Sequence, residues 1–316
     1  MTTLALAAVE DAAARIASRV HVTPLLSNRS ISERTGSAVR LKCENLQRAG
    51  AFKIRGALNA LLLLREEDRS RGVVAFSSGN HAQGVALAAR MLGIPATIIM
   101  PERAVAAKVE ATRAYGAAVV QSGVNEKNRH EVAARIAAES GAIIIPPFDH
   151  DDIIAGAGTV GLEILSQWPE VEAIVVPLGG GGLLSGVALA ATSINPKVRV
   201  YGVEPAAGDD GRQSFRAGSI VRIDPPATIA DGARTLSLGE RTFAIIRERV
   251  TDIVTVGDDE LLAELRYTMS RTKLVIEPTG CLAVAALLQR SLDLAGQKVV
   301  AVISGGNLDF DLLSER

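Results

Sequence analysis

The feature that most constrains the fold is a regular alternation of short β-rich runs with helical stretches, which begins at Val73. The run VVAF precedes a helical stretch over 81–92, and the same order continues through ATIIM and AAVV to a last run, AIII. Parallel strands that follow one another along a chain need long crossovers, usually helices, and these crossovers are right-handed. The alternation therefore predicts a parallel sheet with helices on its faces.

A second series of the same kind follows Asp149. Its β-rich runs are AIVVP, RVYGVEP and VVAVISGG, with helical stretches between them. Apolar residues make up 48% of the chain and aromatic residues 3%, a balance typical of sheets that helices cover on both faces. We therefore predict an α/β protein with two open twisted sheets flanked by helices. A small mobile domain, 70–148, is inserted into a large domain formed by 1–69 and 149–316.

Charge and hydropathy bear on the class of partner. The net charge of −1 at pH 7 gives no broad electrostatic reason to expect nucleic acid or an anionic membrane surface. No run approaches the roughly 18 uninterrupted apolar residues that a membrane span needs. The N-terminal segment lacks a basic stretch before its apolar residues and indicates a surface helix. We expect a small-molecule ligand and a cytoplasmic location.

A run of glycines lies between the predicted strand AIVVP and the helical stretch LLSGVALAA. It consists of Gly179, Gly180, Gly181 and Gly182. Backbone amides in such a loop, at the start of a helix, suit a phosphate. The run does not fit GxGxxG, because Leu184 or Ser185 occupies the place of the third glycine, and Val187 stands where a P-loop needs lysine. The alternatives are a phosphate site without a nucleotide motif and a simple tight turn.

Lys53 stands between Phe52 and Ile54 in the segment AGAFKIRGA, at the start of a predicted helix. A lysine that apolar neighbours desolvate has a lowered pKa and can form a Schiff base with a carbonyl compound. The alternative is a surface lysine whose aliphatic stem lies along apolar residues.

The segment FSSGNHAQG leaves a predicted strand and enters a helix. Its polar side chains, together with free helix-terminal amides, suit a carboxylate. These side chains belong to Ser77, Ser78, Asn80 and His81. The alternative is an ordinary helix N-cap. Ser304 follows the last predicted strand, at the edge where open α/β sheets bind ligands, unless it serves only as a capping residue.

Together these segments resemble those of one enzyme family, the fold-type II pyridoxal phosphate (PLP) enzymes of the serine/threonine dehydratase and serine racemase family. The segments that match in order and spacing are AFKIRGA, FSSGNHAQG, PLGGGGLLSG and VISGGN. The resemblance covers nearly the whole chain and includes PPFDHDDIIAGAGTVGLEI, YGVEP, TIADGART and KLVIEPTG. It implies PLP as the cofactor and an amino acid as the substrate.

The resemblance also implies which residues bind the cofactor. Lys53 forms a Schiff base with PLP, Asn80 bonds the 3′ oxygen, and Ser304 faces the pyridine nitrogen. A neutral hydroxyl at Ser304 leaves that nitrogen unprotonated, which favours elimination of a β-substituent. The remaining contacts are Phe52 and Gly232 on the ring, and Gly179, Gly180, Gly181 and Gly182 at the phosphate with Leu183 beside them.

For the substrate, the resemblance implies that Lys53, once freed from the cofactor, removes the α-proton. The carboxylate is held by Ser77, Ser78, Asn80 and His81. Loss of the β-hydroxyl then yields a 2-oxo acid and ammonia, while closure of the small domain excludes water. Ser78 would lie on the face opposite Lys53, where racemases exchange a proton with the D-enantiomer.

We expect dehydration and deamination of L-threonine or L-serine. The alternatives on the same scaffold are a serine racemase and a dehydratase for 3-hydroxyaspartate or another hydroxy amino acid. Arg135 aligns with a gate arginine of racemase-like members and would bind the substrate. Gln121 stands where mammalian racemases carry a tyrosine that stacks on ATP, so nucleotide activation is not expected. The family usually forms homodimers, and we expect one here. An alternative of another class is a catalytically silent ligand-binding protein.

A second site is implied after the run RVYGVEP. Family members bind a divalent cation there through two acidic side chains and a main-chain carbonyl, which in this chain belong to Glu204, Asp210 and Gly208. Oxygen ligands suit Mg²⁺, Mn²⁺ or Ca²⁺. The alternative is an acidic surface turn without a metal.

Overall fold

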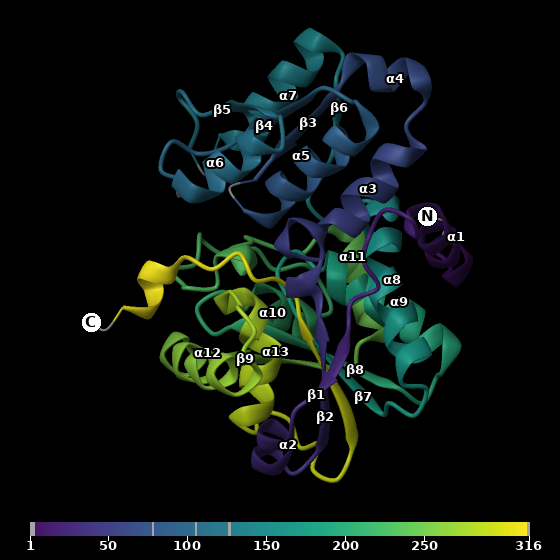
Figure 1. Cartoon of the computed structure of the whole chain (residues 1–316), viewed down its shortest axis with the longest axis vertical. Helices are drawn as coiled ribbons and strands as arrows, with labels where there is room; N and C mark the ends of the chain where they lie inside the picture. Colours follow the sequence, from purple (N-terminus) through teal and green to yellow (C-terminus); the bar gives the residue numbers. More distant parts are fainter. Residues whose placement is uncertain (1–3, 78, 105, 126–127, 315–316) are drawn as a thin grey trace.

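The computed structural model describes residues 4–77, 79–104, 106–125 and 128–314, which form two sheets flanked by helices (Figure 1). The strands are β1 (Leu25–Ser27), β2 (Ala38–Cys43), β3 (Val73–Phe76), β4 (Ala96–Ile99), β5 (Ala118–Val120), β6 (Ile143–Ile144), β7 (Ala173–Pro177), β8 (Arg199–Pro205), β9 (Asp252–Val256) and β10 (Lys298–Ile303). The helices are α1 (Leu6–Ile16), α2 (Arg29–Thr35), α3 (Lys53–Leu63), α4 (Glu66–Arg71), α5 (Asn80–Leu92), α6 (Ala106–Ala114), α7 (Arg129–Ser140), α8 (Asp151–Gln167), α9 (Gly182–Ile194), α10 (Asp210–Ala217), α11 (Glu240–Arg249), α12 (Asp258–Thr272) and α13 (Pro278–Leu288). The predicted fold class is confirmed.

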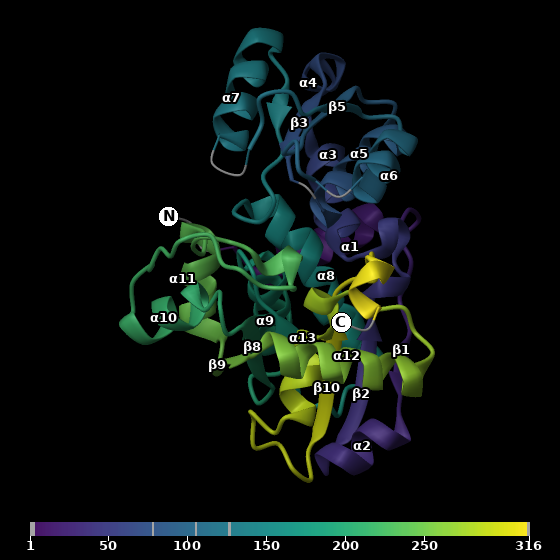
Figure 2. The same cartoon turned by 90° about the vertical axis from the view of Figure 1, so that its left-hand side faces the viewer.

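The two sheets differ in size and occupy different parts of the molecule (Figures 1 and 2). The large sheet has the strand order β1-β2-β10-β7-β8-β9, and the small sheet has the order β5-β4-β3-β6. β1 pairs antiparallel with β2, while β2, β10, β7, β8 and β9, and likewise the strands of the small sheet, pair in parallel. The small sheet lies within the predicted range 70–148. The exact domain boundaries and the mobility of the small domain stay predictions.

Side chains alternate between the two faces of the large sheet. In β10, Val299, Ala301 and Ile303 share an apolar cluster with α12 and α13. Val300 and Val302 point the other way and share a cluster with α8, α9 and α11. All five side chains are buried, because successive residues of a strand face opposite sides and helices cover both. Burial on both faces explains why the strand is an unbroken apolar run.

α8 lies between α3 and α9, and glycines allow the three helices to pack closely. A Cβ on Gly156 in α8 would lie 2.6 Å from the Cα of Gly56 in α3. A Cβ on Gly158 would lie 2.9 Å from the carbonyl oxygen of Gly186 in α9. Glycine weakens an isolated helix, so this segment is helical because of its packing. The close contact fixes α3, which begins at Lys53, against α8.

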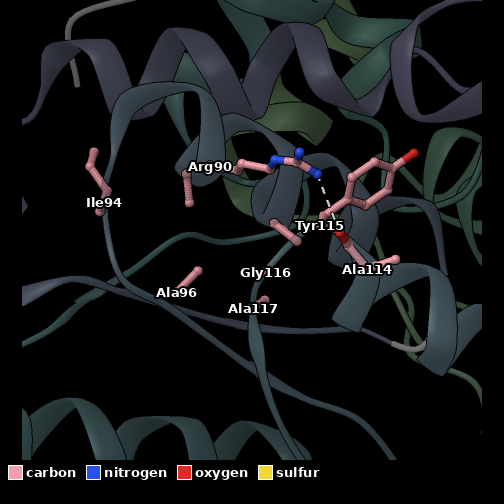
Figure 3. A pocket seen from close by; sticks show the side chains of 9 residues that line it. Arg90, Ile94, Ala96, Ala114, Tyr115, Gly116 and Ala117 are labelled. Carbon is pink, nitrogen blue, oxygen red and sulfur yellow. Dashed lines mark hydrogen bonds between the residues drawn. The ribbon is translucent and has the colours of Figure 1, made fainter.

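The small domain carries a surface pocket of about 310 Å³ between α5, β4 and the turn after α6 (Figure 3). Arg90 donates to the carbonyl oxygen of Ala114 at 3.3 Å, and most of the other lining side chains are small and apolar. None of the described residues that line this pocket is predicted to bind cofactor, substrate or metal. The pocket is therefore not the predicted active site.

Within the described ranges, no helix is long and apolar enough to cross a membrane. The cytoplasmic location and the homodimer expected from the sequence stay predictions.

Candidate active site

Lys53 lies where the chain passes from the large sheet toward the small domain. Ala51 forms an isolated antiparallel bridge with Gly305, and the backbone N–H of Phe52 donates to the carbonyl oxygen of Ser304 at 3.1 Å. These contacts fix the start of α3 beside the carboxyl end of β10. The lysine segment and the sheet edge at Ser304, which the sequence predicts as parts of one site, are therefore in contact.

The Lys53 amine is held by a backbone group, and the residue is half-buried. Its Nζ donates to the carbonyl oxygen of Pro147 at 2.8 Å and lies 5.1 Å from the centre of the Phe52 ring. Burial lowers the pKa of Lys53 to about 8, because an ammonium ion is poorly solvated there. Part of the amine is thus neutral at mildly alkaline pH, as a nucleophile or a base requires.

The glycine loop connects the end of β7 to the start of α9, as predicted. The φ angle of Gly181 is +95°, a conformation that favours glycine. A Cβ on Gly180 would lie 2.2 Å from the Phe148 ring, and a Cβ on Gly179 would lie 3.0 Å from the carbonyl oxygen of Gly232. Only backbone fits at these positions. A loop of this kind at a helix N-terminus suits a phosphate.

Two residues that the sequence did not single out brace this loop. The Thr242 hydroxyl in α11 donates to the carbonyl oxygen of Gly180 at 2.9 Å, and Phe148 packs on the same glycine. Asp149 holds the start of α11 by accepting the backbone N–H of Thr242 at 3.2 Å. Thr242 and Gly180 are 62 residues apart, so no local motif could mark this contact.

The turn between β3 and α5 belongs to the small domain and carries the residues predicted to bind the substrate carboxylate. Ser78 lies outside the described residues. The hydroxyl oxygen of Ser77 accepts the backbone N–H of Gly79 at 3.2 Å, and α5 begins at Asn80. The first amides of a helix have no partner within it. Amides in this position suit a carboxylate.

His81 is buried, which changes the role that the sequence suggests for it. Its Nε2 lies 3.0 Å from the carbonyl oxygen of Ile145, where it acts as a donor. Burial and the nearby charge of Lys53 lower the pKa of His81 to about 3. The ring is therefore uncharged near pH 7 and gives a substrate carboxylate no positive charge.

The remaining predicted cofactor residues border the same region. Ser304 is buried at the end of β10, and Leu183 is buried at the start of α9. Gly232 donates its backbone N–H to the hydroxyl of Thr279 at 2.9 Å. Beside it, Asp231 forms an ion pair with Lys108 of α6. This ion pair joins the large domain to the small domain next to the glycine loop.

The substrate contact expected of Arg135 stays a prediction. Arg135 lies exposed in the second half of α7. The first turn of α7 contacts the end of β3 instead, because the His130 ring packs edge-on against Phe76 with 5.0 Å between ring centres. The sequence predicts the helix but does not show which end of it meets the turn that begins at Ser77.

The predicted metal residues lie at the end of β8 and the start of α10. The Glu204 carboxylate accepts the backbone N–H groups of Gly211 and Arg212 at 3.0 and 2.8 Å. Both carboxylate oxygens of Asp210 are buried without a hydrogen-bond partner among the described residues. Burial raises the pKa of Glu204 well above its usual value and that of Asp210 to about 7. The described part of the chain contains no group of three or more His, Cys, Asp or Glu residues placed to hold a metal.

The class of protein follows from a comparison with known families. A family model described as pyridoxal-phosphate dependent enzyme matches residues 16–305, and the chain therefore belongs to this family. The glycine loop, which has room only for backbone, and the desolvated Lys53 fit this cofactor. The prediction of PLP is confirmed.

Particular relatives resemble the chain over nearly its whole length. L-threo-3-hydroxyaspartate ammonia-lyase of Saccharomyces cerevisiae is 53% identical, over 95% of this chain and 92% of that protein. Serine racemase of Schizosaccharomyces pombe is 50% identical, over 96% of this chain and 94% of that protein. The solved structure of maize serine racemase superposes on this chain with a TM-score of 0.95 and a sequence identity of 42%. The match covers 98% of this chain and 96% of that chain. The family resemblance is confirmed, and these relatives carry more than one activity.

Proposed function

We propose that the protein is a PLP-dependent ammonia-lyase for a small β-hydroxy amino acid, with L-threo-3-hydroxyaspartate as its preferred substrate. The observation that carries the reaction class is the Lys53 amine, which has a lowered pKa and donates to the carbonyl oxygen of Pro147. The identity of 53% to a hydroxyaspartate ammonia-lyase supports this substrate. L-Threonine and L-serine, which the sequence alone favours, become the second candidates.

The residues of the chain supply binding and proton transfer in this proposal. When bound, PLP would withdraw electrons from the α-carbon of the substrate, so that the α-proton and the β-hydroxyl can leave. Gly179 to Gly182 hold the phosphate through backbone N–H groups. The first-turn amides of α5, with Ser77 and Asn80, bind the substrate carboxylate. Lys53 takes the α-proton, because its lowered pKa leaves a neutral amine.

A panel of hydroxy amino acids tests this function. We expect ammonia and 2-oxo acid to be released from L-threo-3-hydroxyaspartate with a kcat/KM about tenfold or more above those for L-serine and L-threonine. The erythro isomer is the matched control for stereochemistry, and chiral analysis of the L-serine reaction detects D-serine. A higher kcat/KM for threonine or serine would reverse the substrate order. Racemisation without ammonia release from any substrate would point to a serine racemase instead.

The pKa of Lys53 predicts how cofactor loading depends on pH. Its folded-state value of about 8 lies below the ordinary lysine value, so the protonated form dominates below pH 8 and the neutral form above it. We expect the rate at which the cofactor-free protein acquires visible absorption to rise about tenfold per pH unit below 8 and to level off above it. Stopped-flow absorbance after addition of PLP measures this rate. A rate that still climbs between pH 9 and pH 10 would show an ordinary lysine.

We infer further that Glu204, Asp210 and the carbonyl group of Gly208 bind a divalent cation. Burial, and after it the nearby Asp210, raise the pKa of Glu204. Two acids placed together in a buried site are costly without a counter-charge. The unpartnered oxygens of Asp210 support the proposal. A hard cation with oxygen ligands would supply both the charge and the missing partner.

Thermal stability tests the cation site. We expect Mg²⁺, Mn²⁺ or Ca²⁺ to raise the Tm of the parent protein and a chelator to lower it, because a ligand at about 100 times its Kd adds about 2.7 kcal/mol of stability. Asp210→Asn should abolish this response and should melt above the metal-free parent, since it removes a buried unpaired charge. Asp209→Asn is the matched control and should keep the response. Insensitivity of the parent to all three cations and to chelator would remove the site.

A further inference from the structure

Two side chains of the large domain hold the Asn80 amide. Glu277 directly precedes α13, and Asn307 lies in the segment that follows β10. The Nδ2 of Asn80 donates to Oε1 of Glu277 at 2.5 Å, and the Oδ1 of Asn80 accepts from Nδ2 of Asn307 at 2.8 Å. Both ends of the amide are thus engaged by residues with no role so far.

The direction of these hydrogen bonds is set by a backbone carbonyl. The Nδ2 of Asn307 also donates to the carbonyl oxygen of Ala49 at 2.8 Å, and a carbonyl oxygen only accepts. The nitrogen of Asn307 must therefore face both Ala49 and Asn80, so the oxygen of Asn80 points to Asn307. The nitrogen of Asn80 then has two N–H groups, of which one goes to Glu277 and one is left for a ligand.

The packing around Glu277 leaves room for this arrangement. Glu277 is 1% exposed, and its backbone N–H donates to the carbonyl oxygen of Gly305 at 3.2 Å. A Cβ on Gly305 would lie 2.2 Å from Oε1 of Glu277 and 3.0 Å from Nδ2 of Asn80. Only glycine therefore leaves the space in which the carboxyl group meets the amide. Gly305 directly follows Ser304, the residue expected to face the pyridine nitrogen.

The carboxyl group of Glu277 can accept the Asn80 N–H in either protonation state. Burial and the charge of Asp231 raise the pKa of Glu277 to about 8, and Lys108 and the Asn80 hydrogen bond oppose this shift. A protonated carboxyl group keeps a carbonyl oxygen that accepts. The orientation of Asn80 is thus maintained on both sides of that pKa.

We propose that Glu277 and Asn307 are positioning residues that orient the Asn80 amide so that it presents an N–H group, and not its carbonyl oxygen, to the 3′ oxygen of PLP. They have this role only within the proposed function, in which Asn80 contacts the cofactor. An N–H group stabilises an anionic oxygen, whereas a carbonyl oxygen in its place would repel it. The orientation therefore bears on the electronic state of the bound cofactor.

Asn307→Asp tests this proposal in the holoenzyme. The substitution preserves the size of the side chain but replaces its donor with an acceptor, so the new carboxylate competes with Glu277 for the Asn80 nitrogen. The share of protein in which Asn80 presents its oxygen to the cofactor should therefore rise. We expect the visible band of bound PLP to weaken in favour of the colourless form in which the 3′ oxygen keeps its proton. We also expect the Kd for PLP to rise about 10- to 100-fold.

Asn45→Asp is the matched control. Asn45 is also buried, and its amide donates to the carbonyl oxygen of Val275 at 3.0 Å. It lies in the same region, because a Cβ on Gly306 would be 3.0 Å from its own Cβ. The control should lower Tm, since it places a charge against a carbonyl group, but should leave the absorption spectrum and the Kd for PLP unchanged.

The outcomes separate the positioning role from the wider function. If Asn307→Asp does not fold, Asn307→Ala replaces it and should give a smaller shift of the same sign, because one of the two contacts that orient the Asn80 amide is then lost. An unchanged spectrum in the variant that folds, or an equal shift in Asn45→Asp, would overturn the positioning role. If the unmodified protein binds no PLP, the proposed function fails instead.

Discussion

The Lys53→Ala protein is expected to fold but to lose the visible absorption of bound PLP, and to release ammonia at no more than about a thousandth of the parent rate. The substitution removes both the attachment point of the cofactor and the base for the α-proton. Its effect on folding should be small, about 1 kcal/mol, because among the described residues the Lys53 amine makes one hydrogen bond, to the carbonyl oxygen of Pro147 at 2.8 Å.

The other lysines give this experiment its controls. Lys42 and Lys108 are each paired with a carboxylate, so neither is a free amine that could replace Lys53. Lys197 is exposed, and Lys197→Ala should keep both colour and activity. Absorption spectra, ammonia assays and thermal melts of the two variants decide the matter. A Lys53→Ala protein that stays yellow and active would exclude the assigned role.

Arg55→Met is expected to destabilise the cofactor-free protein by about 3–5 kcal/mol, the usual effect of removing one partner from a buried ion pair. Arg55 is 1% exposed and lies between two carboxylates, with Nε 2.7 Å from Glu44 and Nη1 2.6 Å from Glu163. Glu163 would keep its contact with Lys42. Glu44 would keep the Thr23 hydroxyl but no charged hydrogen-bond partner among the described residues.

The loss of stability caused by Arg55→Met should depend on pH, because Arg55 shifts the pKa of Glu44. Burial acts to raise the pKa of Glu44, but the Arg55 guanidinium outweighs it and lowers that pKa. In the parent, the stabilisation is present above the ordinary glutamate pKa and is lost as pH falls through the lowered one. In the variant, Glu44 is left in a buried site and takes up a proton more readily. The stability difference should therefore shrink as pH is lowered.

Arg29→Met is the matched control for the loss of an arginine ion pair. Arg29 pairs with Glu33 in an exposed position, with side chains 90% and 64% exposed, and its loss should change stability by less than about 1 kcal/mol. Urea unfolding of the cofactor-free proteins at several pH values compares the two variants. Equal effects of the two substitutions would show that the buried network adds no more than a surface pair.

The parts of the fold that local patterns determine were predictable from the sequence. The run VVAF coincides with β3, and the helical stretch 81–92 coincides closely with α5. Gly93 caps the end of α5 with a φ angle of +67°. The glycine loop also lies where expected, because strand, loop and helix follow one another along the chain. β9 was not singled out, because its burial is partial and does not alternate regularly.

Contacts between distant segments were not predictable in this way. The bracing of Gly180 by Thr242 joins residues far apart in the sequence, and so does the contact of Asn80 with Glu277. The loss of charge from His81 depends on burial by the surrounding fold. Arg135 could not be placed because the sequence of a helix does not show which of its ends meets a neighbouring strand.

The most direct test of the central claim, that Lys53 carries PLP, is reduction of the holoenzyme with borohydride followed by peptide mass mapping. Reduction makes the Schiff base permanent and leaves a phosphopyridoxyl group on the lysine that formed it. We predict that this group is found on the peptide that contains Lys53. A label on another lysine, or no label in protein supplied with PLP, would contradict the claim.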